Sequence, residues 1–260
     1  MAGVQEREGF PPGVPCWIDT QQPARDAALR FYGAVFGWSF ENHLQRGDRA
    51  YDLATLDGRV VAAIGSGPSD TTATWTTYIG VDDVEAAVAN VEAAGGTVVA
   101  PPLRAGSAGR LALVTDPTGA NLALWEPGRR KGVERVNEPG SWNWSLLSTP
   151  DPAGAAAFYA EVFGYGIDEV DMGGSEPFRV LQVDGKGVAG VREHVPQLGD
   201  MPPHWSTVFS VADTDETCAR AVELGGRVVM EPIDLPDIGR IAVLQGPVGA
   251  VFQVIQPPPE

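Results

Sequence analysis

One long internal repeat constrains the fold of this chain more than any other feature of its sequence. The stretch from Val14 to Trp38 consists of a short apolar segment, a helical segment with an aromatic pair, and a glycine followed by an aromatic residue. The stretch from Ser141 to Tyr165 repeats these parts, and Phe31-Tyr32 recurs as Phe158-Tyr159. Later matches are offset by three further residues, so one insertion lies in the loop before His204. The repeat predicts two domains of similar architecture.

Each copy contains the same order of short elements twice. Ala28, Tyr32 and Val35 follow the spacing of a helix with one buried face. Asp57-Gly58, between two apolar runs, is typical of a tight hairpin. Each unit therefore has the order βαβββ, and the chain contains four units. In the first copy we predict a strand at 15–20, a helix at 25–35 and strands at 38–41, 51–56 and 60–64, followed by a strand at 76–81, a helix that begins at 84, and strands at 97–99, 110–115 and 121–125.

The domain boundaries follow from the repeat and from a polar stretch between the copies. We assign residues 1–12 to an N-terminal tail, 13–127 to the first domain, 128–139 to a linker and 140–257 to the second domain. The linker is locally basic and has no apolar periodicity, which is typical of a solvated connection. We expect the tail to be loose.

Composition limits the partners and the compartment. The formal net charge of −16 disfavours nucleic acid and anionic membranes, because both are densely negative. No apolar run approaches the roughly 18 residues of a membrane span, and the N-terminus lacks the apolar core of a secretion signal. Cys16 and Cys218 form no disulfide framework or metal motif, which favours a reducing compartment. We therefore expect a cytoplasmic protein, monomeric or homodimeric, whose partner is a small molecule.

Several motifs carry a family resemblance over nearly the whole chain. The opening segment ends in Phe31-Tyr32 and Phe36-Gly37, and the closing half contains Gly95-Gly96, Gly109-Arg-Leu-Ala and Asp116-Pro-Thr-Gly-Ala. These motifs resemble those of the vicinal oxygen chelate superfamily, which contains glyoxalase I, extradiol dioxygenases and bleomycin-resistance proteins. Pro-Cys-Trp-Ile-Asp19 resembles a two-domain actinobacterial branch whose members are labelled hydroxylases or glyoxalase-like antigens. The resemblance implies an α+β fold of tandem glyoxalase-like domains, in which four βαβββ modules form half-barrel cups.

The resemblance also indicates where a metal would be bound. Metal-dependent members place His, Gln or Glu on the first and last strands of each unit, where a divalent cation acts as a Lewis acid. Only one corresponding residue here, Gln253, is a plausible ligand, and one ligand does not hold a metal. We therefore predict no metal site and no cofactor, although the sequence does not exclude a divalent metal. The corresponding positions are Trp17, Ala62 or Ala63, Thr76, Ala123, Trp144, Ala189 or Gly190, Ser206 and Gln253.

These replacements leave cups with aromatic and small side chains. Strand alternation predicts one inward face in each domain, and aromatic walls with a few polar groups are typical of small-molecule pockets. The same aromatic residues would also serve as the core of the half-barrels, and the pattern does not separate these roles. The predicted ligand-binding residues are Trp17, Tyr51, Thr76, Tyr78 and Trp125 in the first domain and Trp144, Phe178, Ser206 and Gln253 in the second.

Asp19 and His204 are the candidate catalytic residues. Asp19 is the one carboxylate placed on an inward face, where it would act as a base or pair with a cationic ligand. Its counterpart is Leu146, so the two cups are predicted to differ. His204 lies at the mouth of a strand near a cup rim, whereas His43 is expected in a surface loop and His194 after a strand.

Three functions stay open from the sequence. The first is a metal-independent protein that binds an aromatic or planar small molecule, such as an antibiotic or a secondary metabolite. The alternative is an enzyme of the same superfamily, a lyase or isomerase or a hydroxylase or dioxygenase, with Asp19 or His204 moving protons. The third is a scaffold or antigen without a small ligand. Tight stoichiometric binding without turnover would distinguish the first from the other two.

Overall fold

The computed structural model describes residues 5–6, 8–46, 49–70, 72–194 and 201–258. The first domain forms one open sheet in the order β3-β4-β5-β2-β6-β9-β8-β7. The first strands of its two units, β2 and β6, lie side by side in the middle, so the sheet curves around them into one cup. Its elements are β2 (Pro15–Gln22), α1 (Arg25–Phe36), β3 (Ser39–Arg46), β4 (Arg49–Leu56), β5 (Arg59–Ser66), β6 (Trp75–Gly80), α2 (Val84–Ala93), β7 (Thr97–Arg104), β8 (Gly109–Thr115) and β9 (Asn121–Pro127).

The second domain repeats this arrangement in the order β12-β13-β14-β11-β15-β18-β17-β16. The four βαβββ units and the α+β fold are therefore as predicted, and neither sheet closes into a barrel. The elements are β11 (Trp142–Thr149), α3 (Pro152–Phe163), β12 (Gly166–Val170), β13 (Phe178–Val183), β14 (Lys186–Glu193), β15 (His204–Ser210), α4 (Thr214–Glu223), β16 (Arg227–Leu235), β17 (Gly239–Gln245) and β18 (Val251–Gln256).

Local sequence signals explain where these elements end. Asp57 and Gly58 both have positive φ, 49° and 75°, as a two-residue hairpin turn requires, and the repeated Asp184-Gly185 has 50° and 72°. Gly37 ends α1 in the left-handed conformation at φ 74°, which a residue without a Cβ adopts at little cost. Gly164 ends α3 in the same way.

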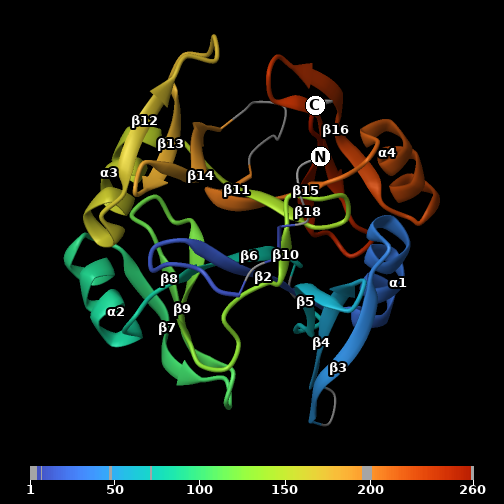
Figure 1. Cartoon of the computed structure of the whole chain (residues 1–260), viewed down its shortest axis with the longest axis horizontal. Coiled ribbons are helices and arrows are strands. Elements are labelled where there is room, and N and C mark those ends of the chain that lie inside the picture. The colour runs from blue at the N-terminus through green and yellow to red at the C-terminus, as the bar shows by residue number, and fades with distance from the viewer. Residues whose placement is uncertain (1–4, 7, 47–48, 71, 195–200, 259–260) are drawn as a thin grey trace.

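The first helix of each domain packs on the other domain. From α1, the Phe31 ring lies 6.2 Å from Phe252 of β18, and the Phe36 ring lies 4.6 Å from Phe209 of β15. The buried Phe158 and Tyr159 of α3 pack in one core with strands of the first domain. The repeated Phe-Tyr pair is therefore the core between the domains. In Figure 1 the pairs α1–α4 and α2–α3 flank the molecule, and the two cups open away from each other.

Three details differ from the sequence expectations. Gln5–Glu6 (β1), in the segment expected to be a loose tail, pairs with Arg135–Val136 (β10). β10 lies in the expected linker and pairs with β11, so tail and linker extend the second sheet. His43, expected in a loop, lies on the exposed strand β3, because the β3–β4 hairpin is longer than its apolar pattern indicated. No helix among the described residues is long and apolar enough to cross a membrane.

Candidate functional site

The interiors of the two cups correspond residue by residue. Trp17 pairs across the sheet with Tyr78, and its counterpart Trp144 pairs with Val208. Tyr78 in turn lies beside Ala123, and Val208 lies beside Gln253. Since paired residues of neighbouring strands point to the same face, the side chains predicted to point inward share the concave face of each sheet. The two cups can therefore be compared position by position.

A buried carboxyl group is the centre of the first cup. Tyr51 and Tyr78 each donate a hydrogen bond of 2.8 Å to Asp19 Oδ2, and the Gln21 amide donates a longer one of 3.5 Å. Trp17 Nε1 donates to the Tyr51 hydroxyl at 3.1 Å. Asp19 is 2% exposed, and its Oδ1 atom has no hydrogen-bond partner among the described residues. The structure thus brings Trp17, Asp19, Tyr51 and Tyr78 together.

The titration of this carboxyl group is shifted toward neutral pH. Burial raises the pKa of Asp19 to about 6, because it disfavours the charged form more than the hydrogen bonds stabilise it. Burial, and then the charge of Asp19, raise the pKa of Tyr51 and of Tyr78 well above the usual value of tyrosine. Both hydroxyl groups therefore keep their protons and act as donors. The arrangement can hold or release one proton on Asp19 near neutral pH.

The linker closes one end of the first cup. The Arg130 guanidinium lies 5.7 Å from the centre of the Trp17 ring, and the Arg130 carbonyl accepts a hydrogen bond from Trp125 Nε1 at 3.0 Å. Trp17 and Trp125 are consequently buried. Beside the linker is a pocket of about 390 Å³ lined by basic side chains, in which an Arg130–Glu134 ion pair of 3.0 Å offsets part of the charge. Its lining residues are Glu8, Arg59, Arg129, Arg130, Lys131, Gly132, Val133 and Glu134.

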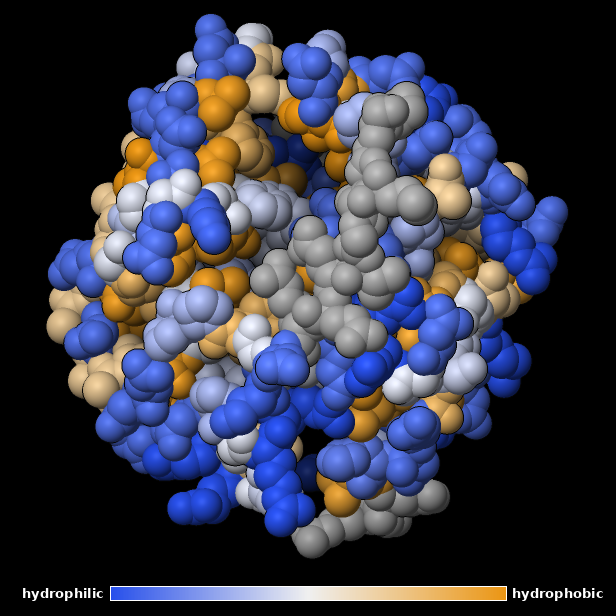
Figure 2. All heavy atoms as spheres, viewed as in Figure 1, coloured by the Kyte–Doolittle hydropathy of each residue, from blue (hydrophilic) through white to orange (hydrophobic). Residues whose placement is uncertain are grey.

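The second cup has an apolar floor and partly exposed aromatic walls. A Cβ atom at Gly190 would lie 2.4 Å from Phe178 Cζ and 3.0 Å from both Trp144 Nε1 and Leu146 Cδ1. The absence of a side chain at Gly190 therefore lets these three side chains converge. Figure 2 shows a hollow in the upper part of the view, with hydrophobic atoms beside it. The apolar cluster consists of Leu146, Val208, Ile241 and Ile255, with Trp144, Phe178, Met230 and Leu235 partly buried around it.

Two polar side chains interrupt this apolar surface. Gln253 is 3% exposed, and its Nε2 atom has no hydrogen-bond partner in the part of the chain that the structure describes. Ser206 is buried beside Leu146 on the neighbouring strand. An unpartnered amide in a buried position destabilises the fold by about 1–3 kcal/mol, which is unusual outside functional sites. Gln253 Nε2 is thus a buried donor without a described acceptor inside the cup.

His204 lies on β15 at the rim of the second cup, whereas Asp19 lies on β2 inside the first. The structure therefore does not join the two candidate catalytic residues in one site. Thr76, like Ser206, is on the inward face, where it pairs with Asp19. Arg192, which sequence reasoning missed, is on the same face as Gly190 and also reaches the rim of the second cup. Strand alternation from Gly190 was the signal that could have identified it.

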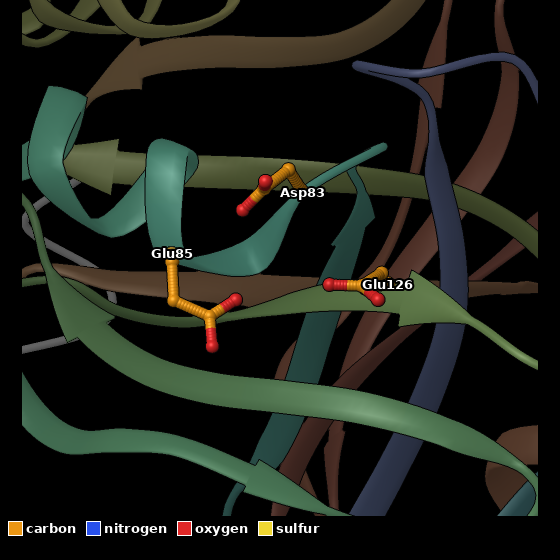
Figure 3. Close-up of side chains that lie close together, drawn as sticks. All are labelled: Asp83, Glu85 and Glu126. Carbon is orange, nitrogen blue, oxygen red and sulfur yellow. The ribbon is translucent and has the colours of Figure 1, made fainter.

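The positions where the family binds a divalent cation do not carry a set of ligands for one here. They hold Trp, Ala, Gly, Thr and Ser in addition to Gln253, and a single amide does not hold such an ion. Among the described residues, one carboxylate group outside the cups, Asp83, Glu85 and Glu126, is close enough to share an ion (Figure 3).

This acidic group has structural partners. Asp83 accepts from Ala86 N, Glu126 accepts from Val84 N at the start of α2, and Arg110 forms ion pairs with Glu85 and Glu126. The carboxylates of Asp83 and Glu126 therefore cap the first N–H groups of α2, and Arg110 offsets the negative charge of Glu85 and Glu126.

The two open sheets with concave faces define a tandem α+β fold, which does not by itself determine a function. The family model of the Glyoxalase/Bleomycin resistance protein/Dioxygenase superfamily matches residues 23–124 and 141–254. The chain belongs to this superfamily.

Named relatives and solved structures agree with the family. An alignment of 262 positions covers 99% of this chain and all of a Mycobacterium tuberculosis protein named "Putative glyoxylase CFP32", with 40% identity. It is 36% identical, over 95% of its length and 94% of the relative, to "Anthracycline biosynthesis protein DnrV" of Streptomyces peucetius. The 2,3-dioxygenase LapB from Pseudomonas sp. KL28 has the same fold, with a TM-score of 0.66 at 18% identity, covering 94% of this chain and 93% of LapB. The Mn(II)-bound glyoxalase from Novosphingobium aromaticivorans has a TM-score of 0.65 at 16% identity, covering 94% and 82%.

Proposed function

We propose that the cup of the second domain binds an aromatic or planar small molecule of secondary metabolism without the help of a metal ion. One observation carries the proposal: a buried amide without a partner, Gln253 Nε2, lies in an otherwise apolar cup with partly exposed aromatic walls. Apolar pockets with a few placed polar groups are typical of small-molecule sites. The first cup is less suited, because Trp17, Tyr78 and Trp125 are buried and Trp17 is hydrogen-bonded to Tyr51.

The chemistry of the lining favours a fused aromatic ligand with a carbonyl oxygen. Trp144 and Phe178 offer ring faces on which a planar molecule can stack, and Leu146 and Val208 offer an apolar floor. Gln253 would donate a hydrogen bond to a carbonyl or quinone oxygen. The relatives named for anthracycline biosynthesis support this class, since anthracyclines contain fused aromatic rings with quinone oxygens.

The test is a binding titration with 2-hydroxyanthraquinone, followed by absorbance and by calorimetry. We expect one saturable site per chain, at least about tenfold weaker in Trp144→Ala, because an aromatic anchor contributes strongly to binding. Trp17→Phe, a milder change at the corresponding position of the first cup, should bind like the wild type. Absence of saturable binding, or binding that depends on Trp17 and not on Trp144, would contradict the proposal.

Metal independence is tested in the same titration. Because the family's metal-ligand positions hold only one amide here, where a metal would need several ligands, dialysis against EDTA should leave the affinity for 2-hydroxyanthraquinone unchanged. An affinity that falls after EDTA treatment and returns with Zn²⁺ or Mn²⁺ would show that a metal takes part.

A second candidate function rests on a different observation. In the first cup, Asp19 has a pKa of about 6 and one buried oxygen without a described partner, so it is placed to accept a proton from a substrate. The hemithioacetal of methylglyoxal and glutathione, the substrate of glyoxalase I, is the probe for this activity. Turnover should rise with pH through about 6, as Asp19 ionises, and should disappear in Asp19→Asn. Turnover that survives in Asp19→Asn, or none at all in the wild type, would exclude this candidate.

A further inference from the structure

Two more buried polar atoms without described partners lie at the rim of the second cup. They are Arg192 Nη2 and His204 Nε2. Ser148 of β11 pairs with Arg192 on one side and with His204 on the other. Neighbouring strands lie about 5 Å apart, so the two residues flank Ser148 on one face. The Arg192 side chain leans over β11, because its Nε donates to Ser148 Oγ at 3.2 Å.

The two groups offer opposite hydrogen-bonding roles. His204 Nδ1 donates to the Pro202 carbonyl at 2.8 Å, since a carbonyl can only accept. Burial lowers the pKa of His204, so the ring is neutral near pH 7 and Nε2 carries a free lone pair. Arg192 keeps its positive charge and has only donors. A carboxylate ligand would be repelled by the lone pair, whereas a hydroxyl group accepts from one residue and donates to the other.

We propose that Arg192 and His204 clamp a phenolic hydroxyl group of the aromatic ligand. Arg192 Nη2 donates a hydrogen bond to the phenol oxygen, and the hydroxyl group donates a hydrogen bond to the lone pair of His204 Nε2. No bond is broken, and the proton stays on the phenol oxygen. The inference rests on the proposed function, because it places this phenol in the same cup.

The corresponding positions of the first cup support a specific role for the Arg192–His204 clamp. In the first cup these positions hold Gly65 and Thr74, which supply neither a cation nor a base. The first domain therefore adopts the same fold without this pair of side chains. Gln253 lies on the same concave face, so a ligand can bind Gln253 through a carbonyl oxygen and the clamp through a hydroxyl group.

The test compares 2-hydroxyanthraquinone with 2-methoxyanthraquinone and unsubstituted 9,10-anthraquinone, one pH unit below the pKa of the free hydroxy dye. We expect the hydroxy dye to bind about 10- to 100-fold more tightly than the other two, as a charged hydrogen bond implies. Arg192→Met and His204→Thr should each remove the preference for the hydroxy dye over unsubstituted 9,10-anthraquinone, because each removes one half of the clamp. Arg220→Met, on the exposed face of α4, should behave like the wild type.

The outcomes separate the two proposals. Equal binding of the three dyes, still weakened by Trp144→Ala, would overturn the clamp and leave the proposed function intact. A hydroxyl preference that survives in both Arg192→Met and His204→Thr would also overturn the clamp. Failure of all three dyes to bind would overturn the proposed function and the clamp together.

Discussion

The two cups have the same strand registers and opposite interiors. In the first, a carboxyl group and two hydroxyl groups form one buried network; in the second, the same three positions form an apolar floor. The exchanged positions are Asp19 and Leu146, Tyr51 and Phe178, and Tyr78 and Val208. A carboxyl group buried without donors is strongly destabilising, and so is a hydroxyl group buried without a partner. The residues at these three positions must therefore be exchanged together.

The unpartnered atoms differ between the cups as well. The second cup has three side chains with buried unpartnered groups among the described residues, Arg192, His204 and Gln253, whereas the first has one, Asp19 Oδ1. The first cup satisfies most of its polar groups internally, whereas the second has three without a described partner, as the proposed ligand site requires. Each prediction below changes one side of this comparison toward the other.

The largest effect is expected when the carboxyl group alone is moved into the second cup. Leu146→Asp would place a charge among Phe178 and Val208, and we expect a loss of about 3–5 kcal/mol in the free energy of unfolding at pH 7. The loss should be smaller near pH 4, where the new carboxyl group, with a raised pKa, is neutral. Urea unfolding at both pH values measures it.

Two further variants control this prediction. Leu146→Asn, which has the same shape without the charge, should lose clearly less stability at pH 7. Adding Phe178→Tyr and Val208→Tyr to Leu146→Asp should recover about half of the loss, because it rebuilds the donors of the first cup. No recovery would show that the set is not transferable.

The converse change removes the donors from the first cup. Tyr51→Phe with Tyr78→Phe leaves Asp19 Oδ2 without its two short hydrogen bonds, and we expect a loss of about 2–4 kcal/mol at pH 7. In an Asp19→Leu background the same pair of changes should cost less than about 1 kcal/mol. The loss of the Trp17 Nε1 acceptor occurs in both backgrounds and cancels in the cycle. Equal losses in both backgrounds would contradict a network centred on Asp19.

The sequence predicts these interiors in part. The repeat, the Asp57-Gly58 turn and strand alternation were enough to place Asp19, Tyr51 and Tyr78 on one concave face. They were not enough to show that both hydroxyl groups meet one carboxylate oxygen. That contact depends on the curvature of the sheet across β4, β2 and β6, which results from packing of the whole domain.

The sequence pattern also did not identify the surface on which each helix packs. The spacing of Phe31, Tyr32 and Phe36 predicts a buried helix face, yet it does not identify the surface that covers it. The structure places that face against Phe209 and Phe252 of the other domain. Likewise, unpartnered atoms such as Gln253 Nε2 are visible only when every neighbour is placed.

The pH dependence of Asp19 gives a further comparison. The folded-state pKa of about 6 lies above 3.8, the ordinary value of an aspartate side chain, so the folded protein binds the proton more tightly than the unfolded chain. The contribution of Asp19 to stability is therefore full below about pH 4 and is lost as pH rises through about 6. Asp19→Asn should be more stable than the wild type at pH 7, by at most about 3 kcal/mol, and this difference should vanish near pH 4. A constant difference from pH 4 to pH 8, measured by urea unfolding, would contradict the shifted pKa.

The smallest effect on stability is expected from replacing a buried amide: Gln253, which has no described partner, is compared with Gln22, which has one. Gln253→Leu should raise the stability by about 1 kcal/mol, because it removes a buried donor without a described partner, and should weaken 2-hydroxyanthraquinone binding about tenfold. Gln22→Leu is the matched control in the first domain. Gln22 is 1% exposed, and its Nε2 donates to Thr20 Oγ1 at 2.8 Å, so the change should lower stability and leave binding unaltered. If Gln253→Leu lowers stability as Gln22→Leu does, the amide is part of the core; a gain in stability with a loss of affinity identifies it as a group held ready for a ligand.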